Sequence, residues 1–371
     1  MSFVQREGIT YLELTFWACG ERACDKEIIK LEKFVITGGK PLHGEVIISG
    51  AKNAAVGILP ATILAADVCV IENLPDISDV AVSLKILSVL GAKVRMLNKN
   101  TYEIDTTHLT GTNVPDDLSR QMRASYYFLG ALLSRFGRAQ VAMPGGCAIG
   151  ARPVDLHLSA LEKMGARFDL EDGYILGRCR KLKGAHITFD LPTVGGTENL
   201  LMAAALAEGE TILENAAREP EVVDLANFLL VCGARIEGQG TSCIRVQGVN
   251  GLHGAEYAIM PDRIEAGTFL VAAGITGGEL LLRHCPFTEL EAVILKLQSM
   301  GMDITATPDG VLAKCGCPLR GADISTQPYP GFPTDMQAQI MALMCLADGA
   351  SVVEESIFEN RFMHVLELMR M

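Results

Sequence analysis

The chain has 371 residues, of which 49% are hydrophobic, and its formal net charge is −12. A chain of this length and composition can bury a large core, and the length predicts two domains. The negative charge argues against nucleic acid as a partner, because phosphates bind to basic surfaces. The longest apolar run, 58–71, contains Pro60 and Asp67 and is too short to span a bilayer, so no membrane partner is expected.

The 11 cysteines follow no visible pairing scheme, and we recognise no signal peptide. Both features predict a reducing, cytoplasmic location. No cysteine pair has a second ligand pair at zinc-like spacing, so neither a metal nor another cofactor is expected. Free cysteines are usually buried, and we expect Cys69, Cys232, Cys285 and Cys345 to lie in the core.

A first pattern, Leu-x-x-apolar-Gly, recurs along the chain at intervals of about seventy residues. It predicts helices that end at a glycine in the left-handed conformation. The copies end at Gly91, Gly165, Gly233 and Gly301, and a further copy starts at Leu368.

A second pattern is an apolar helical run followed by a strand-like run, usually with a glycine between them. Together the two patterns predict units of the form β-α-β-α-β-β, hence an α/β (α+β) fold. The run from Asn199 to Leu206 is so apolar that we expect it to be buried on most sides. A solenoid that only displays a surface is the alternative architecture. The copies of the second pattern lie at 58–66, 128–137, 200–213, 269–282 and 340–353.

Between Pro144 and His157 the chain reads PGGCAIGARPVDLH, which sets the thiol of Cys147 in a glycine-rich loop close to Arg152. Glycines allow such a loop unusual backbone conformations, and a nearby guanidinium favours the thiolate and binds anions. We therefore interpret Cys147 as a reactive thiol that can give and take protons near neutral pH.

Five motifs in this order resemble the UDP-N-acetylglucosamine 1-carboxyvinyltransferase family of enolpyruvyl transferases. The resemblance covers 33–371, and several long motifs in one order are far more specific than a single glycine pattern. The motifs are GEVIISGAKN at 44–53, the Cys147 loop, ENAAREP at 214–220, PDRIE at 261–265 and FPTDMQAQ at 332–339.

The resemblance implies an inside-out α/β barrel fold with two domains, each of three repeated units, and a substrate cleft between them. The first domain would comprise 52–260 and would carry the Cys147 loop. The second would combine 33–51 with 261–371, so the chain would cross between the domains twice.

The family transfers the enolpyruvyl group of phosphoenolpyruvate to the 3-hydroxyl of UDP-N-acetylglucosamine and releases phosphate. Its phosphoenolpyruvate site corresponds here to Lys52, Asn53 and Arg152, and a guanidinium can grip a phosphate or carboxylate with two bonds. Cys147 resembles the family's general acid, and Asp335 resembles the carboxylate that meets the sugar hydroxyl. Without the resemblance, Asp335 would be interpreted as a simple helix cap.

The resemblance also implies a binding site for the nucleotide sugar, in which backbone amides of two turns hold the diphosphate. These positions are Arg123, Arg152, Pro153, Val154, Asp155, Leu156, Thr193, Val194, Asp335 and Ile357.

The chain departs from the family pattern at both ends. The family has six units, whereas this chain stops inside the fifth at Met371, so we expect an incomplete second domain and weak or absent turnover. Residues 1–32 have no counterpart in the resemblance, and we expect 1–29 to be disordered or loosely attached.

Two alternative functions remain at this stage. The first is transfer to shikimate 3-phosphate, which uses the same fold and chemistry but does not explain the Cys147 loop. The second is a nucleotide-sugar-binding protein without catalysis, which does not explain the catalytic set that includes Asp335.

Overall fold

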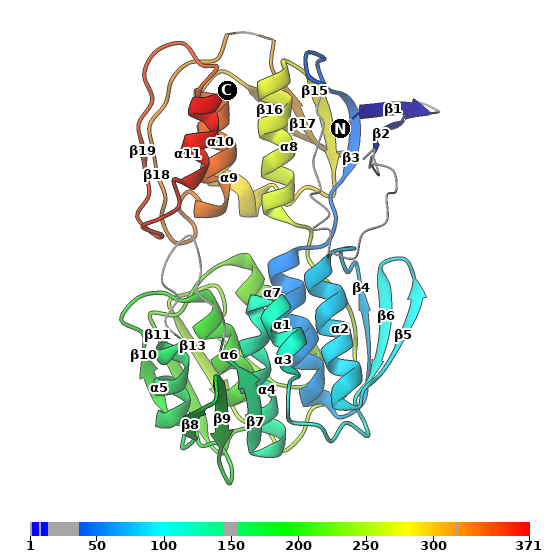
Figure 1. Ribbon diagram of the computed structural model, residues 1–371, viewed down its shortest axis with the longest axis vertical. Helices are drawn as coiled ribbons and strands as arrows, with labels where there is room; N and C mark the ends of the chain where they lie inside the picture. The colour runs from blue at the N-terminus through cyan, green and yellow to red at the C-terminus, as the bar shows by residue number, and fades with distance from the viewer. Residues whose placement is uncertain (1, 7–8, 14–36, 144–153, 317) are drawn as a thin grey trace, which may run out of the picture.

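The computed structural model describes residues 2–6, 9–13, 37–143, 154–316 and 318–371. Two bodies are stacked along the long axis (Figure 1). We call residues 51–260 the first body, and residues 37–50 with 261–371 the second body. Each body has its own cluster of buried hydrophobic residues. The predicted α/β class is confirmed.

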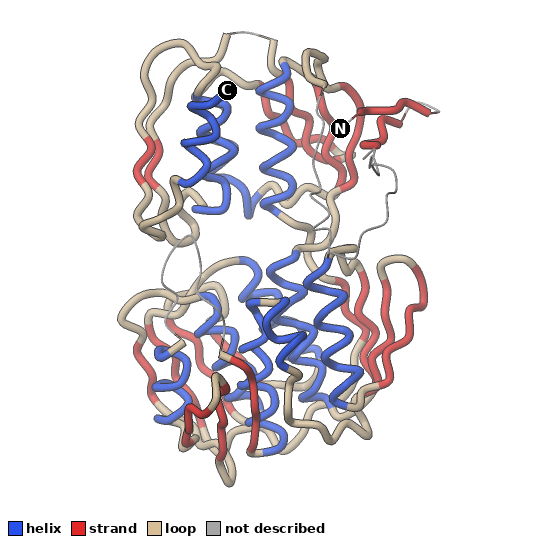
Figure 2. Tube along the Cα trace, viewed as in Figure 1, coloured by secondary structure: helices blue, strands red, loops and turns tan. Residues whose placement is uncertain are grey.

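In the first body the helices gather at the centre and the strands lie toward the outside (Figure 2). Helices α1, α4 and α6 pack against one another. Residues Asn199 to Ala205 of α6 are fully buried, which confirms the predicted burial of this run. The helices of this body are α1 (Lys52–Ala61), α2 (Ser78–Leu90), α3 (Asp116–Gln121), α4 (Tyr127–Phe136), α5 (Asp155–Lys163), α6 (Val194–Ala205) and α7 (Pro220–Val231).

The sheets of the first body repeat one design, in which one outer pair of strands is parallel and the other neighbours are antiparallel. The three-stranded sheet has no fourth strand among the described residues, and an isolated parallel bridge between Asn113 and Gln140 takes its place. In spatial order the sheets are β14 (Glu256–Ala258), β4 (Val68–Glu72), β6 (Thr101–Asp105), β5 (Lys93–Asn98); β10 (His186–Thr188), β11 (Glu210–Glu214), β13 (Cys243–Gln247), β12 (Arg235–Glu237); and β7 (Arg138–Ala142), β9 (Tyr174–Arg178), β8 (Arg167–Glu171).

The second body repeats the same design with a four-stranded sheet and a parallel pair of strands. The sheet is β16 (Asp303–Thr307), β17 (Gly310–Lys314), β15 (Glu279–Arg283) and β3 (His43–Ile47), and the pair is β18 (Ile324–Ser325) and β19 (Val353–Glu354). Its helices are α8 (Arg263–Thr276), α9 (Glu291–Ser299), α10 (Gln337–Met344) and α11 (Met363–Arg370).

The chain passes between the bodies twice, at two adjacent segments. Ala51 donates its backbone N–H to Met260, and Asp262 donates to Ser49, each at 2.8 Å. Strand β3 precedes α1 in the sequence but pairs with β15 of the second body, while β14 pairs with β4 of the first. The two crossings therefore place the start of α1 beside the start of α8.

The glycines that end the first sequence pattern all adopt positive φ, which confirms their predicted role at helix ends. In the second pattern, Gly277 rather than Gly278 ends α8, with φ of 62°. The first copy has no glycine, and Ala66 takes the left-handed conformation there, with φ of 53°.

The expected burial of the cysteines is confirmed only in part. Cys69 and Cys232 are buried, whereas Cys285 is half-buried and Cys345 is exposed. The prediction was wrong for Cys345 because it follows the last turn of α10, a helix covered on one side only.

At the N-terminus, β1 (Ser2–Arg6) pairs antiparallel with β2 (Ile9–Glu13), inside the segment for which disorder is expected. The remainder of 1–36 lies outside the described residues. Within the described ranges, none of the helices has the length and apolar character needed to cross a membrane.

Candidate active site

Several helices begin where the two bodies meet. Pro220 occupies the first turn of α7, where its missing N–H costs nothing. Asp262 caps α8, because its Oδ1 accepts from the backbone N–H groups of Ile264 at 2.8 Å and Glu265 at 3.0 Å. Helix N-termini attract negative charge, so this boundary favours anionic groups.

Lys52 is the first residue of α1 and lies at this boundary. Its backbone N–H donates to Asp262 Oδ2 at 3.2 Å, and its Nζ lies 2.7 Å from Asp79 Oδ2 in the first turn of α2. The Lys52 side chain is 53% exposed, so the ammonium can also be reached by an anion from solvent. Asn53 follows on α1 and is half-buried.

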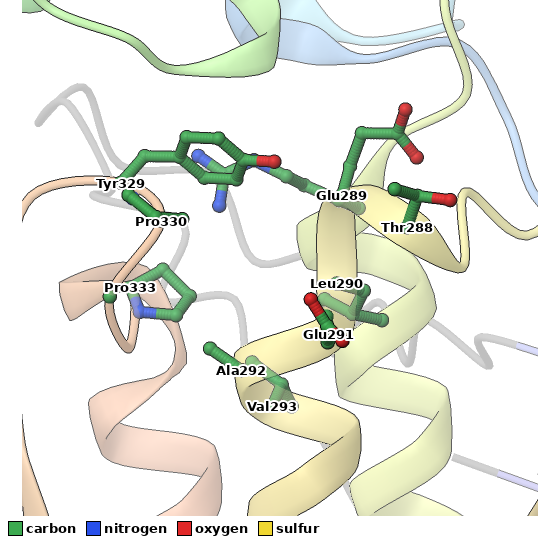
Figure 3. Close-up of a pocket in the computed structure, with 11 residues that line it drawn as sticks. Thr288, Glu289, Leu290, Glu291, Ala292, Val293, Tyr329, Pro330 and Pro333 are labelled. Atoms are coloured by element: carbon green, nitrogen blue, oxygen red, sulfur yellow. The ribbon is translucent and has the colours of Figure 1, made fainter.

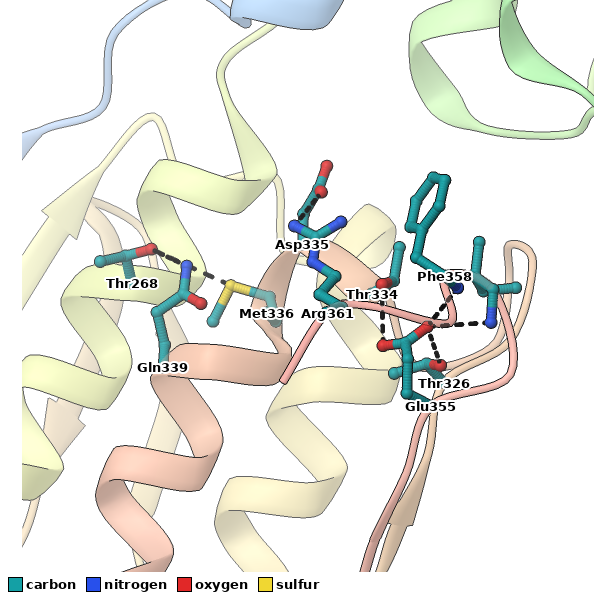
Figure 4. Close-up of polar contacts among 10 residues, drawn as sticks. Thr268, Thr326, Thr334, Asp335, Met336, Gln339, Glu355, Phe358 and Arg361 are labelled. Carbon is teal, nitrogen blue, oxygen red and sulfur yellow. Dashed lines mark hydrogen bonds and ion pairs between the residues drawn. The ribbon is translucent and has the colours of Figure 1, made fainter. Parts of the chain in front are cut away.

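Asp335 lies on the opposite side of the boundary, in the 3-10 helix Thr334–Met336 that leads into α10. Its Oδ1 accepts a hydrogen bond from Arg361 Nη2 at 2.6 Å (Figure 4). The half-exposed carboxylate is therefore held in one orientation.

Arg263 connects the two sides. Its buried guanidinium donates to Glu221 of the first body, at 3.0 Å from Nε and 3.3 Å from Nη2. Burial disfavours the charged guanidinium, but the carboxylates of Glu221, Glu219 and Asp335 outweigh it and raise the pKa of Arg263. Lys52 and Asp335 therefore flank the adjacent residues Asp262 and Arg263, on opposite bodies.

A recess beside Arg263 belongs to the second body (Figure 3). Its cavity volume is about 40 Å³. The Tyr329 ring covers the Arg263 guanidinium at 5.7 Å and faces Glu289 across the recess. The recess is lined by Arg263, 288–293, 329–331 and Pro333.

A second group of predicted residues surrounds the starts of α5 and α6. Thr193 caps α6, with its Oγ1 accepting from Gly196 N at 3.2 Å. Asn199 of α6 joins three segments: its Oδ1 accepts from Gly130 N at 2.7 Å, and its Nδ2 contacts Tyr126 O at 2.9 Å and His157 Nδ1 at 3.3 Å.

Burial lowers the pKa of His157 to about 4, so the imidazole is neutral at pH 7. A neutral ring leaves Nδ1 free to accept from Asn199. This packing brings together the backbones of Val154, Asp155, Leu156, Thr193 and Val194, with the 3-10 helix Arg123–Tyr126 beside them.

Ile357 lies in a third place, on the turn after β19 in the second body. Its backbone N–H donates to Glu355 Oε1 at 2.9 Å, and Glu355 also binds Thr334, the residue before Asp335. Two predicted residues, Ile357 and Asp335, are thus brought together. Cys147, Arg152, Pro153 and the side chain of Arg123 lie outside the described residues.

The sequence predictions missed Arg361, Glu221, Arg263 and Asp79 as members of this boundary. Glu221 follows one of the quoted motifs and Arg263 lies inside another, so the motifs carried a signal for both. Arg361 and Asp79 lie outside all five motifs. Among the described residues, no group of three or more His, Cys, Asp or Glu side chains is arranged to hold a metal ion.

Comparison with solved structures identifies the class of protein. The enolpyruvyl transferase NikO from Streptomyces tendae matches 90% of this chain with a TM-score of 0.78 and 25% identity, over 79% of its own length. EPSP synthase from Acinetobacter baumannii matches 85% of the chain with a TM-score of 0.63 and 20% identity, over 74% of its length. The family model described as EPSP synthase (3-phosphoshikimate 1-carboxyvinyltransferase) matches residues 36–371. The chain therefore belongs to the enolpyruvyl transferase family.

Within that family the chain is similar to curated proteins named UDP-N-acetylglucosamine 1-carboxyvinyltransferase. The protein of Desulfovibrio desulfuricans is 68% identical over 342 residues, which cover 92% of this chain and 82% of the relative. The protein of Geotalea uraniireducens is 55% identical over 340 residues, covering 92% of this chain and 81% of the relative.

Proposed function

We propose that this chain transfers the enolpyruvyl group of phosphoenolpyruvate to the 3-hydroxyl of UDP-N-acetylglucosamine and releases phosphate. The observation that carries the proposal is the sequence identity of 55–68%, over 92% of the chain, with relatives named UDP-N-acetylglucosamine 1-carboxyvinyltransferase. The placement of Lys52 and Asp335 on opposite sides of one boundary supports it.

The phosphoenolpyruvate site comprises Lys52, Asn53 and Arg152. The Lys52 ammonium is the described cation of this set, and its partner Asp79 keeps it near the start of α1. An incoming phosphate would exchange with the Asp79 carboxylate, since an exposed ion pair is worth little in water. The α1 N-terminus adds to the attraction.

Asp335 and Cys147 carry out the proton transfers. Asp335 removes the proton of the 3-hydroxyl as its oxygen attacks C2 of phosphoenolpyruvate, while the Cys147 thiol protonates the methylene carbon. In the second step the C2–O bond to phosphate breaks and the leaving phosphate takes the proton held by Asp335. The Cys147 thiolate takes back a proton from the new methyl group, which restores the double bond. Arg361 holds the Asp335 carboxylate in place for the first step.

The nucleotide sugar binds along the starts of α5 and α6 and reaches Asp335. Val154, Asp155, Leu156, Thr193 and Val194 supply backbone amides and side chains for the nucleotide and diphosphate. Arg123 and Arg152 add positive charge, Pro153 belongs to the same set, and Ile357 contacts the ligand from the second body.

We further propose that the two bodies are domains, comprising 52–260 and 33–51 with 261–371, with 1–32 as an extension. The separate hydrophobic clusters and the exchange of β3 and β14 support this division. The reaction would form the first committed step of peptidoglycan synthesis in the cytoplasm, and would thereby support cell shape and division.

The test is phosphate release from phosphoenolpyruvate by the 371-residue chain, with either UDP-N-acetylglucosamine or shikimate 3-phosphate as acceptor. We expect slow release, only with the nucleotide sugar, and loss of that release in Asp335→Ala. Release with shikimate 3-phosphate alone would overturn the proposal.

A binding protein without catalysis would behave differently. It would bind the nucleotide sugar tightly, release no phosphate, and leave Cys147 unmodified by an epoxide phosphonate. We expect instead that the epoxide adds to the Cys147 sulfur, which mass spectrometry of the loop peptide would detect.

A further inference from the structure

The carboxylate of Glu355 joins its own turn to two earlier segments of the second body, at Thr326 and Thr334 (Figure 4). Glu355 follows β19 and is half-buried. Its Oε1 accepts from Thr326 Oγ1 at 2.9 Å, from Ile357 N at 2.9 Å and from Phe358 N at 3.1 Å. Its Oε2 accepts from Thr334 Oγ1 at 2.9 Å. Hydrogen bonds to an ionised acceptor are stronger than neutral ones, so this arrangement is rigid.

The two turns held by Glu355 carry two of the proposed site residues. Thr334 precedes Asp335 in the 3-10 helix, and Ile357 itself donates its N–H to the same carboxylate. A second link connects the turns, because Arg361 bonds Asp335 at 2.6 Å and lies over the Phe358 ring at 5.6 Å. The positions of Asp335 and Ile357 are therefore coupled through Glu355.

We propose that Glu355 is a positioning residue for the acceptor substrate, an inference that rests on the proposed function. It fixes the position of Ile357 relative to Asp335. Ile357 contacts the nucleotide sugar, and Asp335 takes the proton of the sugar 3-hydroxyl. A displacement of about 1 Å at a reacting group can lower the rate about a hundredfold, so the relative position of Ile357 and Asp335 matters for turnover as well as for binding. Lys52, the described cation of the phosphoenolpyruvate site, belongs to the first body and is held by Asp79 and Asp262 rather than by Glu355.

The experiment measures phosphate release and the calorimetric Kd for UDP-N-acetylglucosamine in the full chain and four variants. In Glu355→Ala we expect the Kd for the nucleotide sugar to rise about tenfold or more and kcat to fall. The KM for phosphoenolpyruvate should stay within about twofold. Loss of several charge-assisted hydrogen bonds is sufficient for a change of this size.

Two variants separate positioning from a general loss of stability. In Glu355→Gln the amide oxygen can keep the three contacts of Oε1, and the NH₂ group can donate to Thr334, so we expect recovery to within about threefold. Thr334→Val removes only the link to the Asp335 turn, and should lower kcat by a larger factor than it raises the nucleotide-sugar Kd.

The matched control is Glu354→Ala, which removes the neighbouring exposed carboxylate and should behave as the unmodified chain. The inference is overturned if Glu355→Ala equals Glu354→Ala in both Kd and kcat. It is also overturned if Glu355→Gln loses as much as Glu355→Ala, or if the values for both substrates worsen together. Failure of the unmodified chain to bind or use the nucleotide sugar would instead defeat the proposed function, and the inference with it.

Discussion

Glu198 is a carboxylic acid in the interior of the first body. It lies one turn into α6 and is fully buried, beside Gly57 of α1. Burial, with a smaller contribution from Glu221 and other nearby carboxylates, raises its pKa to about 8, although Tyr127 favours the charged form. Glu198 is therefore mostly protonated at neutral pH.

This pKa predicts how stability depends on pH. The pKa rises from 4.5 in the unfolded chain to about 8 in the folded one, so the folded state binds the extra proton between these values. The contribution of Glu198 to stability is complete below about pH 4.5 and is lost as the pH rises through 8. Between pH 5 and 8, the free energy of urea unfolding of the unmodified chain should fall by up to about 1.4 kcal/mol per pH unit because of Glu198. This fall should be absent in Glu198→Gln. Glu208 is exposed, and the control variant Glu208→Gln should keep the fall. Equal dependence of the free energy of unfolding on pH in the unmodified chain and both variants would contradict the prediction.

At the scale of the element, several helices end at a residue in the left-handed conformation, and at one of these ends the residue is not glycine. Glycine takes the left-handed position after α2, α4 and α8. After the 3-10 helix Thr62–Ala65 that continues α1, this position belongs to Ala66, whose Cβ makes the conformation unfavourable.

Ala66→Gly should therefore stabilise the protein by about 0.5–1 kcal/mol, since relief of the left-handed strain exceeds the entropic cost of glycine. The preceding residue offers a control, because Ala65 is buried and belongs to the 3-10 helix itself. Ala65→Gly should destabilise by about 1 kcal/mol. Denaturation midpoints check both values. A lower midpoint for Ala66→Gly than for the unmodified chain would contradict the strain assigned to the left-handed conformation of Ala66.

At the scale of the whole molecule, polar contacts join the two bodies where the chain crosses. The ion pair between Arg263 and Glu221 is the buried one, with both side chains less than a tenth exposed. Glu219 adds a weaker contact, accepting from Tyr329 N at 3.4 Å. The relative placement of Lys52 and Asp335 depends on this boundary.

Removal of one partner of the buried pair leaves an uncompensated charge, so Glu221→Leu should destabilise the chain by about 3–5 kcal/mol. The double change Glu221→Leu with Arg263→Met should recover most of this loss, because apolar side chains of similar volume replace both ions. The surface pair of Arg178 and Asp169, at 2.7 Å, is the control, and Asp169→Ala should cost about 1 kcal/mol or less. Chemical denaturation measures the free energy of unfolding of all three variants. If Glu221→Leu lowers it no more than Asp169→Ala does, the stabilising role of the buried pair is refuted.

Much of the fold was predictable because the patterns are local. The glycines at helix ends and the apolar run at Asn199 require only neighbours within one helix turn, and the structure confirms both. The exposure of Cys345 was not predictable from its apolar neighbours, because it depends on which side of α10 is covered. Among the proposed site residues, the position of Asp335 at a helix start follows from its motif, while its partner Arg361 does not.

The sequence by itself determined the repeated units, the helix ends and the family, since each is encoded in residues close together or in motifs of fixed order. The tertiary structure alone decided which distant residues meet: Arg263 with Glu221, Asp335 with Arg361, and Glu355 with Thr334 and Ile357. The physical reason is that a carboxylate can pair with any donor that the folded chain brings within about 3 Å, and sequence spacing does not reveal that approach.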